Sequence, residues 1–192
     1  DLHAVERHKN GNIPVLAKLA KEGYAILTAI PSCTLMFKQE LPLLFPQDAE
    51  VKVVADAMFD PFEYLSLRHR DGLLKTQFKK HLGKVSYHVP CHLRVQNMGL
   101  RTQELLKMVP GTQVSTVERC SGHDGTWGVK KEFFANSMKI GRPVFRAMAG
   151  SEPDYISSDC PIAGRHIQQG MGSDAKGEKQ HPISLLRIAY GL

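Results

Sequence analysis

The chain has four cysteines, Cys33, Cys91, Cys120 and Cys160, and these are its residues best suited to specific chemistry. Each directly follows a run of strand length and precedes a loop or a helix start. In a parallel sheet the carboxyl ends of the strands gather along one edge, where ligands of open α/β folds bind. The pattern predicts one shared site for Cys91, Cys120 and Cys160. Chance placement is the alternative, because a free cysteine often behaves as a small buried apolar residue.

Three thiolates at one sheet edge would suit a soft metal, chiefly zinc or an iron–sulfur cluster. Backbone N–H groups at a helix start stabilise a thiolate or a cluster sulfur through the helix dipole. A disulfide pair is the competing interpretation. A reducing compartment disfavours it, although a redox-active thiol stays open.

The elements that would position these cysteines alternate between strand and helix. Asp60, Pro61 and Glu63 have the types and spacing of a capped helix start. Strands are expected over residues 24–30, 84–89, 113–119 and 154–159. Helices are expected over residues 12–22, 35–44, 60–69, 73–82, 101–109, 129–148 (the longest) and 183–190. This order predicts an α/β fold with a mainly parallel sheet flanked by helices and with the cysteines at the carboxyl ends of its strands.

Composition excludes several classes of protein. The chain has 192 residues, 42% of them hydrophobic and 23% charged, with no signal peptide and no run of about 18 apolar residues. Four cysteines in this length are too few for a disulfide-stapled secreted scaffold. We therefore expect a globular cytoplasmic protein without a transmembrane segment, associated with a membrane only through a partner.

The net charge of +6 favours acidic partners. Basic residues gather around Lys75–Lys84 and Lys130–Lys139, where they form solvated helix faces or a docking surface for an acidic protein. Aromatic residues make up only 7% of the chain and do not alternate with these lysines. No nucleic acid is therefore expected as a partner.

Three segments resemble the cysteine-rich CCG domain, namely Tyr-His-Val-Pro-Cys-His at 87–92, Arg-Cys-Ser-Gly-His-Asp-Gly at 119–125 and Ser-Asp-Cys-Pro-Ile-Ala at 158–163. The family pattern is a cysteine between Pro and His, then Cys-Cys-Gly, then Cys-x-x-Cys. The domain occurs, usually in tandem, in the B subunit of heterodisulfide reductase, the C subunit of anaerobic glycerol-3-phosphate dehydrogenase and lactate-utilisation iron–sulfur proteins. In heterodisulfide reductase its motifs hold noncubane 4Fe–4S clusters that cleave a disulfide.

The resemblance also implies a domain organisation. Residues 84–192 resemble one CCG domain, and residues 1–46 resemble the end of a preceding copy, with Cys33 in its last motif as a further cofactor-binding residue. Residues 47–83 would form a helical connection. We expect the earlier cysteines of the first copy to lie upstream of Asp1.

Three positions depart from the family pattern. Ser121 replaces the second cysteine of Cys-Cys-Gly, Ala163 replaces the last cysteine of Cys-x-x-Cys, and Ile30 replaces the leading cysteine of the first copy. Only three of five cysteines therefore remain in the second motif, and this chain alone cannot ligate a noncubane cluster with five thiolates.

Three cysteines still suffice for a cubane 4Fe–4S cluster with one other position, or for zinc with a histidine as fourth ligand. His123 is the foremost candidate, because nearby glycines allow its loop to fold back; a hydrogen-bonded loop residue is the alternative. Ser121 could donate a hydrogen bond to a cluster sulfur or thiolate and tune the potential. His166 and His92 are further candidates, although His92, like His88, is expected mainly to orient its loop.

These features predict an iron–sulfur electron-transfer subunit of a heterodisulfide-reductase-like oxidoreductase complex, with other subunits, a flavoprotein or a ferredoxin as partners. The alternative is a zinc-binding or cluster-free module that binds a partner, and whether the chain is an enzyme by itself stays open. A cysteine hydrolase built from Cys120, His123 and Asp124 is disfavoured, because catalytic triads usually combine residues from separate elements. The glycines after Cys120 match neither the Rossmann nor the P-loop spacing.

Overall fold

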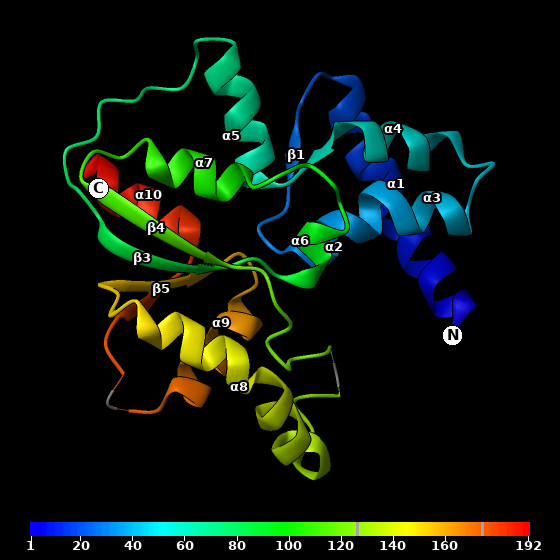
Figure 1. Cartoon of the computed structure of the whole chain (residues 1–192). Coiled ribbons are helices and arrows are strands. Elements are labelled where there is room, and N and C mark those ends of the chain that lie inside the picture. The colour runs from blue at the N-terminus through cyan, green and yellow to red at the C-terminus, as the bar shows by residue number, and fades with distance from the viewer. Residues whose placement is uncertain (126, 174) are drawn as a thin grey trace. The chain divides into compact units, whose positions relative to one another are not determined.

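The computed structural model describes residues 1–125, 127–173 and 175–192. The chain divides into two compact units, Asp1–Tyr64 and Leu65–Leu192 (Figure 1). In the described part, no helix combines the length and the apolar character that a membrane crossing requires.

The first unit is helical, with one pair of short parallel strands, β1 (Ile26–Leu27) and β2 (Met58–Phe59). Its helical elements are α1 (Leu2–Lys21), α2 (Pro31–Leu35), a π-helical turn (Met36–Glu40), α3 (Leu41–Leu44) and α4 (Ala49–Ala57). Helix α1 packs against α4. The core of this unit consists of Ile13, Ala17, Leu41, Val51, Val54 and Met58.

Helix α5 (Pro61–Arg70) begins where the sequence predicts. The backbone N–H of Phe62 donates to Asp60 Oδ1 at 2.9 Å, and the N–H of Asp60 donates to Glu63 Oε2 at 3.2 Å. These reciprocal bonds satisfy N–H groups that a helix start leaves without partners inside the helix. The predicted cap is therefore confirmed.

The second unit is built on a fully parallel sheet in the strand order β4-β3-β5-β6. Its strands are β3 (Gly83–His88), β4 (Thr112–Val117), β5 (Tyr155–Ser158) and β6 (Glu178–Gln180). From the inner strand β3 the chain passes to β4 on one side and then crosses to β5 on the other. The sheet thus changes winding direction at β3, and this is the kind of point where open α/β sheets bind ligands.

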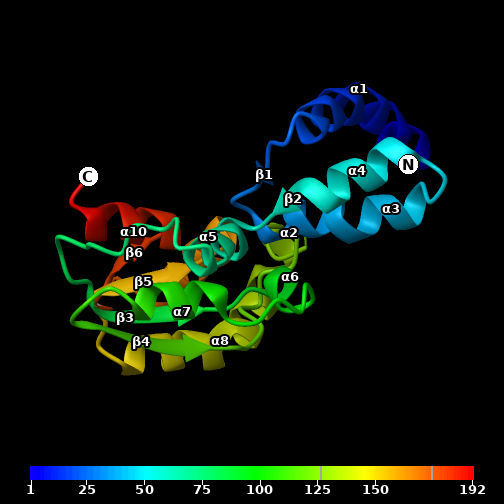
Figure 2. The same ribbon diagram turned by 90° about the horizontal axis from the view of Figure 1, so that it is seen from above.

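Helices cover both faces of this sheet. Figures 1 and 2 show α7 and α10 on one face and α8 and α9 on the other. These helices are α7 (Arg101–Lys107), α8 (Phe134–Gly150), α9 (Pro161–Met171) and α10 (Pro182–Tyr190), beside the short α6 (Cys91–Arg94) and a 3-10 turn (Lys131–Phe133). Val144, Phe145, Met148, Ile156 and Ile167 form a buried apolar cluster between α8, α9 and β5. The three layers confirm the predicted α/β fold with a parallel sheet.

The segment 73–82 is not the helix that the sequence predicts. Instead, the Phe78 ring packs against Tyr190 of α10 with centroids 4.9 Å apart. The backbone N–H groups of the two lysines after Phe78 donate to the carbonyl of Ala189 at 2.8 and 3.0 Å. The last turn of a helix leaves such carbonyls free, so pairing with the end of α10 holds this segment in a non-helical conformation despite its helical composition.

Other boundaries also differ from the prediction. The strand expected over 24–30 is reduced to Ile26–Leu27, and β2, α6, α9 and β6 were not among the expected elements. The helix expected from residue 129 begins at Phe134, after the 3-10 turn, and its 17 residues make it shorter than the 20-residue α1. Trp127 stacks on Phe133 in front of this helix at 5.2 Å between ring centroids, which fixes the turn before the helix starts.

Candidate functional site

The carboxyl ends of three adjacent strands are aligned in one register row, formed by Val117 of β4, His88 of β3 and Ser158 of β5. Cys91 and Cys120 each lie three residues beyond this row, and Cys160 lies two residues beyond it. Because neighbouring strands are about 4.8 Å apart, the three cysteine segments leave the sheet side by side. The predicted gathering of strand ends is therefore present.

The thiol of Cys120 lies close enough to that of Cys91 to affect its pKa. Partial burial raises the pKa of the Cys91 thiol, and the hydrogen-bonded Cys120 thiol beside it raises this pKa further. Both residues are exposed, and neither forms a disulfide. Two thiols that are distant in sequence thus meet at the exits of adjacent strands.

Cys160 forms the N-cap of α9, and its backbone N–H donates to Ser158 Oγ at 3.4 Å. The dipole of a helix start favours a thiolate at such a position. In the part of the chain that the structure describes, however, no group of three or more His, Cys, Asp or Glu side chains is placed to hold a metal ion. The structure therefore pairs Cys91 with Cys120 and puts Cys160 at the end of the next strand, without a complete ligand group.

The loop after Cys120 lies directly on the backbone of α8. Gly122 has a φ of +81°, and a Cβ there would lie 2.1 Å from the Ser137 carbonyl oxygen. A Cβ on Gly141 would lie 2.2 Å from the Ser121 carbonyl oxygen. Ser137 Oγ donates to the Gly122 carbonyl at 2.8 Å, and the Gly122 N–H donates to Cys120 Sγ at 3.4 Å. Glycine is required at both contacts, and together they hold Cys120 beside α8.

His88 connects the three strand ends. Its ring is 1% exposed, with Nδ1 3.0 Å from Ser158 Oγ and Nε2 2.9 Å from the carbonyl oxygen of Arg119. Because a carbonyl only accepts, Nε2 carries the proton and Nδ1 accepts from the serine hydroxyl. Burial lowers the pKa of His88 to about 4. The ring is therefore neutral at pH 7 and links Ser158 to Arg119 at this edge, whereas the sequence predicts that it orients its own loop.

A buried carboxyl group next to Cys160 was not predicted from the sequence. Asp159 accepts hydrogen bonds from the hydroxyl of Tyr87 and, at 2.9 Å, from Thr102 Oγ1. His181 Nε2 donates to its carbonyl oxygen at 3.1 Å. Burial raises the pKa of Asp159 to about 6. An acidic residue directly after a run of strand residues was the only available signal, because the hydroxyl partners come from distant elements.

His123 and His166 lie on the α8 side of the site, with ring centroids 6.2 Å apart. His166 Nε2 lies 3.0 Å from Ser137 Oγ. Burial lowers the pKa of both imidazoles, so both are neutral near pH 7. Among the described residues, the buried Nε2 of His123 has no hydrogen-bond partner. This nitrogen therefore forms no hydrogen bond with Cys120 Sγ.

The remaining predicted residues occupy different places. Ser121 is buried at the contact with α8, and His92 is exposed on α6. Asp124 lies in the loop after Cys120, where its carbonyl oxygen accepts from the backbone N–H of Trp127 at 2.8 Å. Cys33 lies in α2 of the first unit as a half-buried free thiol.

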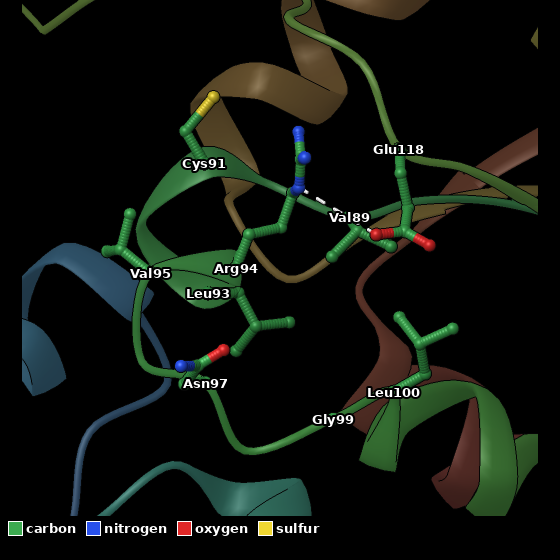
Figure 3. A pocket seen from close by; sticks show the side chains of 9 residues that line it. All are labelled: Val89, Cys91, Leu93, Arg94, Val95, Asn97, Gly99, Leu100 and Glu118. Carbon is green, nitrogen blue, oxygen red and sulfur yellow. Dashed lines mark ion pairs between the residues drawn. The ribbon is translucent and has the colours of Figure 1, made fainter.

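A cleft of about 560 Å³ opens beside Cys91 (Figure 3). Figure 3 shows Val89, Leu93 and Leu100 pointing into it, whereas the sulfur of Cys91 points away from these side chains. Arg94 Nε and Glu118 Oε2 form an ion pair across it at 3.7 Å. The cleft leaves the edge around Cys91 open to solvent.

Comparison with known proteins matches the part of the chain that carries these cysteines. Residues 85–168 match the family model of the CCG cysteine-rich domain, a span that includes Cys91, Cys120 and Cys160. The C subunit of anaerobic glycerol-3-phosphate dehydrogenase from Escherichia coli (strain K12) is 32% identical over 170 residues, which cover 88% of this chain and 41% of that protein. The B subunit of fumarate reductase (CoM/CoB) from Methanothermobacter marburgensis is 27% identical over 178 residues, which cover 89% and 34%.

The chain thus spans less than half the length of these curated relatives. Its matched part contains the whole cysteine-bearing edge of the parallel sheet, from β3 to α9. The chain is homologous to these oxidoreductase subunits, and its residues 85–168 belong to the family of cysteine-rich CCG domains.

Proposed function

We propose that this protein is an iron–sulfur electron-transfer subunit of a heterodisulfide-reductase-like oxidoreductase complex. One observation carries the proposal: Cys91, Cys120 and Cys160 leave three adjacent parallel strands at nearly the same level, and the first two thiols interact. Two relatives that bear the names of redox-enzyme subunits support it.

The donor set suits a cluster that has fewer than four cysteine ligands. Thiolates are the usual ligands of iron–sulfur clusters, and this edge carries three cysteines, of which Cys91 and Cys120 lie together and Cys160 follows the next strand. The partnerless Nε2 of His123 is a candidate for a further ligand, because a buried nitrogen without a hydrogen bond is costly unless something binds it. When bound, such a cluster would accept and release single electrons.

The surrounding residues would tune and orient the thiolates. The N–H of Gly122 already donates to Cys120 Sγ, and such bonds stabilise negative charge on sulfur. The start of α9 would stabilise a thiolate at Cys160. We propose the same stabilising role for the hydroxyl of Ser121. His88 holds the strand ends together through its two ring nitrogens.

The decisive experiment is iron, acid-labile sulfide and zinc analysis of anaerobically purified protein, together with its visible spectrum. We expect iron and sulfide in similar amounts, and we expect Cys120→Ser to lose most of both. Cys33 is proposed to serve a separate motif, so Cys33→Ser is the matched control and should keep the metal content of the unmodified chain. Equal retention of iron and sulfide by both variants would refute the proposed site.

A zinc-binding or cluster-free module that binds a partner is the second candidate. The absence of a complete ligand group among the described residues favours it. About one zinc per chain without sulfide would select the zinc module. A folded protein without iron, sulfide or zinc would select the cluster-free module.

A further inference from the structure

Helix α8 carries positive charge without compensation on its outer face. Lys139, Arg142 and Arg146 are exposed, and α8 contains neither Asp nor Glu. Their spacing of three and four residues places the three cations on one side of the helix. In residues 1–125, 127–173 and 175–192, no carboxylate forms an ion pair with any of them.

Four other helices pair some of their cations with carboxylates. Lysines and arginines of α1, α4, α5 and α7 lie within ion-pair distance of carboxylates. The pairs are Lys9–Asp48, Lys52–Asp56, Arg68–Asp71 and Arg101–Glu104. Each of these four helices thus pairs at least one of its cations with a carboxylate, whereas α8 pairs none of its three among the described residues.

The same face has a limited apolar component. Ile140, next to Lys139 in the sequence, is 49% exposed, whereas Phe134, which is 39% exposed, lies seven residues before Gly141 and thus on the side of the helix that carries the loop after Cys120. The main apolar stripe of α8 is already buried against the sheet and α9, through Val144, Phe145 and Met148. The outer face therefore suits attraction by charge rather than insertion into a lipid surface, which needs a broad apolar face.

The opposite side of α8 carries the loop that follows Cys120. Gly141 touches the backbone of Ser121 so closely that a Cβ would not fit, and Ser137 binds the Gly122 carbonyl. A helix is roughly 10 Å across with its side chains. A protein seated on the outer face of α8 would thus lie about one helix thickness from this loop.

We propose that the outer face of α8, defined by Lys139, Ile140, Arg142 and Arg146, is the docking surface for an acidic electron-carrier protein of the ferredoxin type. The choice of a redox partner rests on the proposed function, and the acidic character follows from the charge of the face. Complementary charges of this kind act mainly by steering association and by fixing orientation.

The test uses the full chain and an acidic ferredoxin as the probe, with binding measured by calorimetry at low and at high ionic strength. The triple variant Lys139→Gln, Arg142→Gln, Arg146→Gln removes three charges but keeps good helix formers. We expect it to bind at least about tenfold more weakly at low salt, with a smaller loss of affinity as salt rises. The matched control, Arg7→Gln, Lys18→Gln, Lys107→Gln, removes three exposed cations elsewhere and should bind like the unmodified chain.

If both triple variants bound ferredoxin equally weakly, the proposal would be overturned, because binding would then depend only on the net charge of the chain. Lack of ferredoxin binding at low salt would also overturn it. Binding instead to vesicles of three parts phosphatidylcholine and one part phosphatidylglycerol would replace the protein partner by a membrane. Iron and sulfide are measured on the same samples, so a docking surface without a cluster is distinguishable from a cluster without docking.

Discussion

His88 stabilises the strand ends as a neutral ring, and this makes its contribution depend on pH. In the folded protein its pKa is about 4, against 6.5 for an ordinary histidine. Between these values the unfolded chain binds the proton and the folded one does not, so the contribution of His88 to stability is complete above pH 6.5 and falls as the pH drops toward 4. The loss amounts to roughly 3 kcal/mol at most.

The contribution of Asp159 to stability depends on pH in the opposite direction from that of His88. Its pKa is raised from 3.8 to about 6, so the folded state binds its proton more tightly and stability falls as pH rises through this range.

Comparing the unmodified chain with His88→Asn isolates the contribution of His88 to stability from that of Asp159. We expect the difference in unfolding free energy, measured by urea titration of metal-free protein, to grow from pH 4 to pH 6.5. A difference that stays constant over this range would show that His88 is not buried as a neutral ring.

The contact between α8 and the cysteine loop is the most constrained junction between elements. Alanine usually favours a helix over glycine by about 1 kcal/mol, yet a Cβ on Gly141 would lie 2.2 Å from the Ser121 carbonyl oxygen. Gly141→Ala is therefore expected to destabilise the protein by roughly 1–3 kcal/mol, as overpacking does. Urea unfolding measures this change.

Gly150→Ala is the matched control on the same helix, because nothing lies within 4 Å of a Cβ there. Its stability should be unchanged or raised by up to about 1 kcal/mol. Stabilisation by both alanines would mean that the loop does not rest on the helix backbone at Gly141.

Sequence patterns predicted those elements whose signals are local. The strands before Cys91, Cys120 and Cys160 show the expected runs, and the cap at Asp60 depends on residues only three apart. The segment 73–82 could not be predicted, because its partner is the end of α10, more than a hundred residues away. The environment of Asp159 could not be predicted either, because its partners Tyr87 and Thr102 are distant in the sequence.

At the scale of the whole molecule, the second unit holds all the parts that the proposed site requires. The parallel sheet, its covering helices, a buried apolar cluster and Cys91, Cys120 and Cys160 all fall within Leu65–Leu192. A parallel sheet needs cover on both faces, and here helices of the same unit supply it. These properties are those of a domain that folds by itself.

A fragment of residues 60–192 therefore tests whether the site depends on the first unit. It keeps Asp60, whose carboxylate caps α5. We expect a cooperative urea transition and the same ratio of metal to protein as in the full chain. The fragment 60–192 with Cys120→Ser is its control, because it should fold equally well but lose the metal. If the fragment folds but binds no metal while the full chain binds it, the first unit contributes a ligand, and Cys33 would be the residue to examine next.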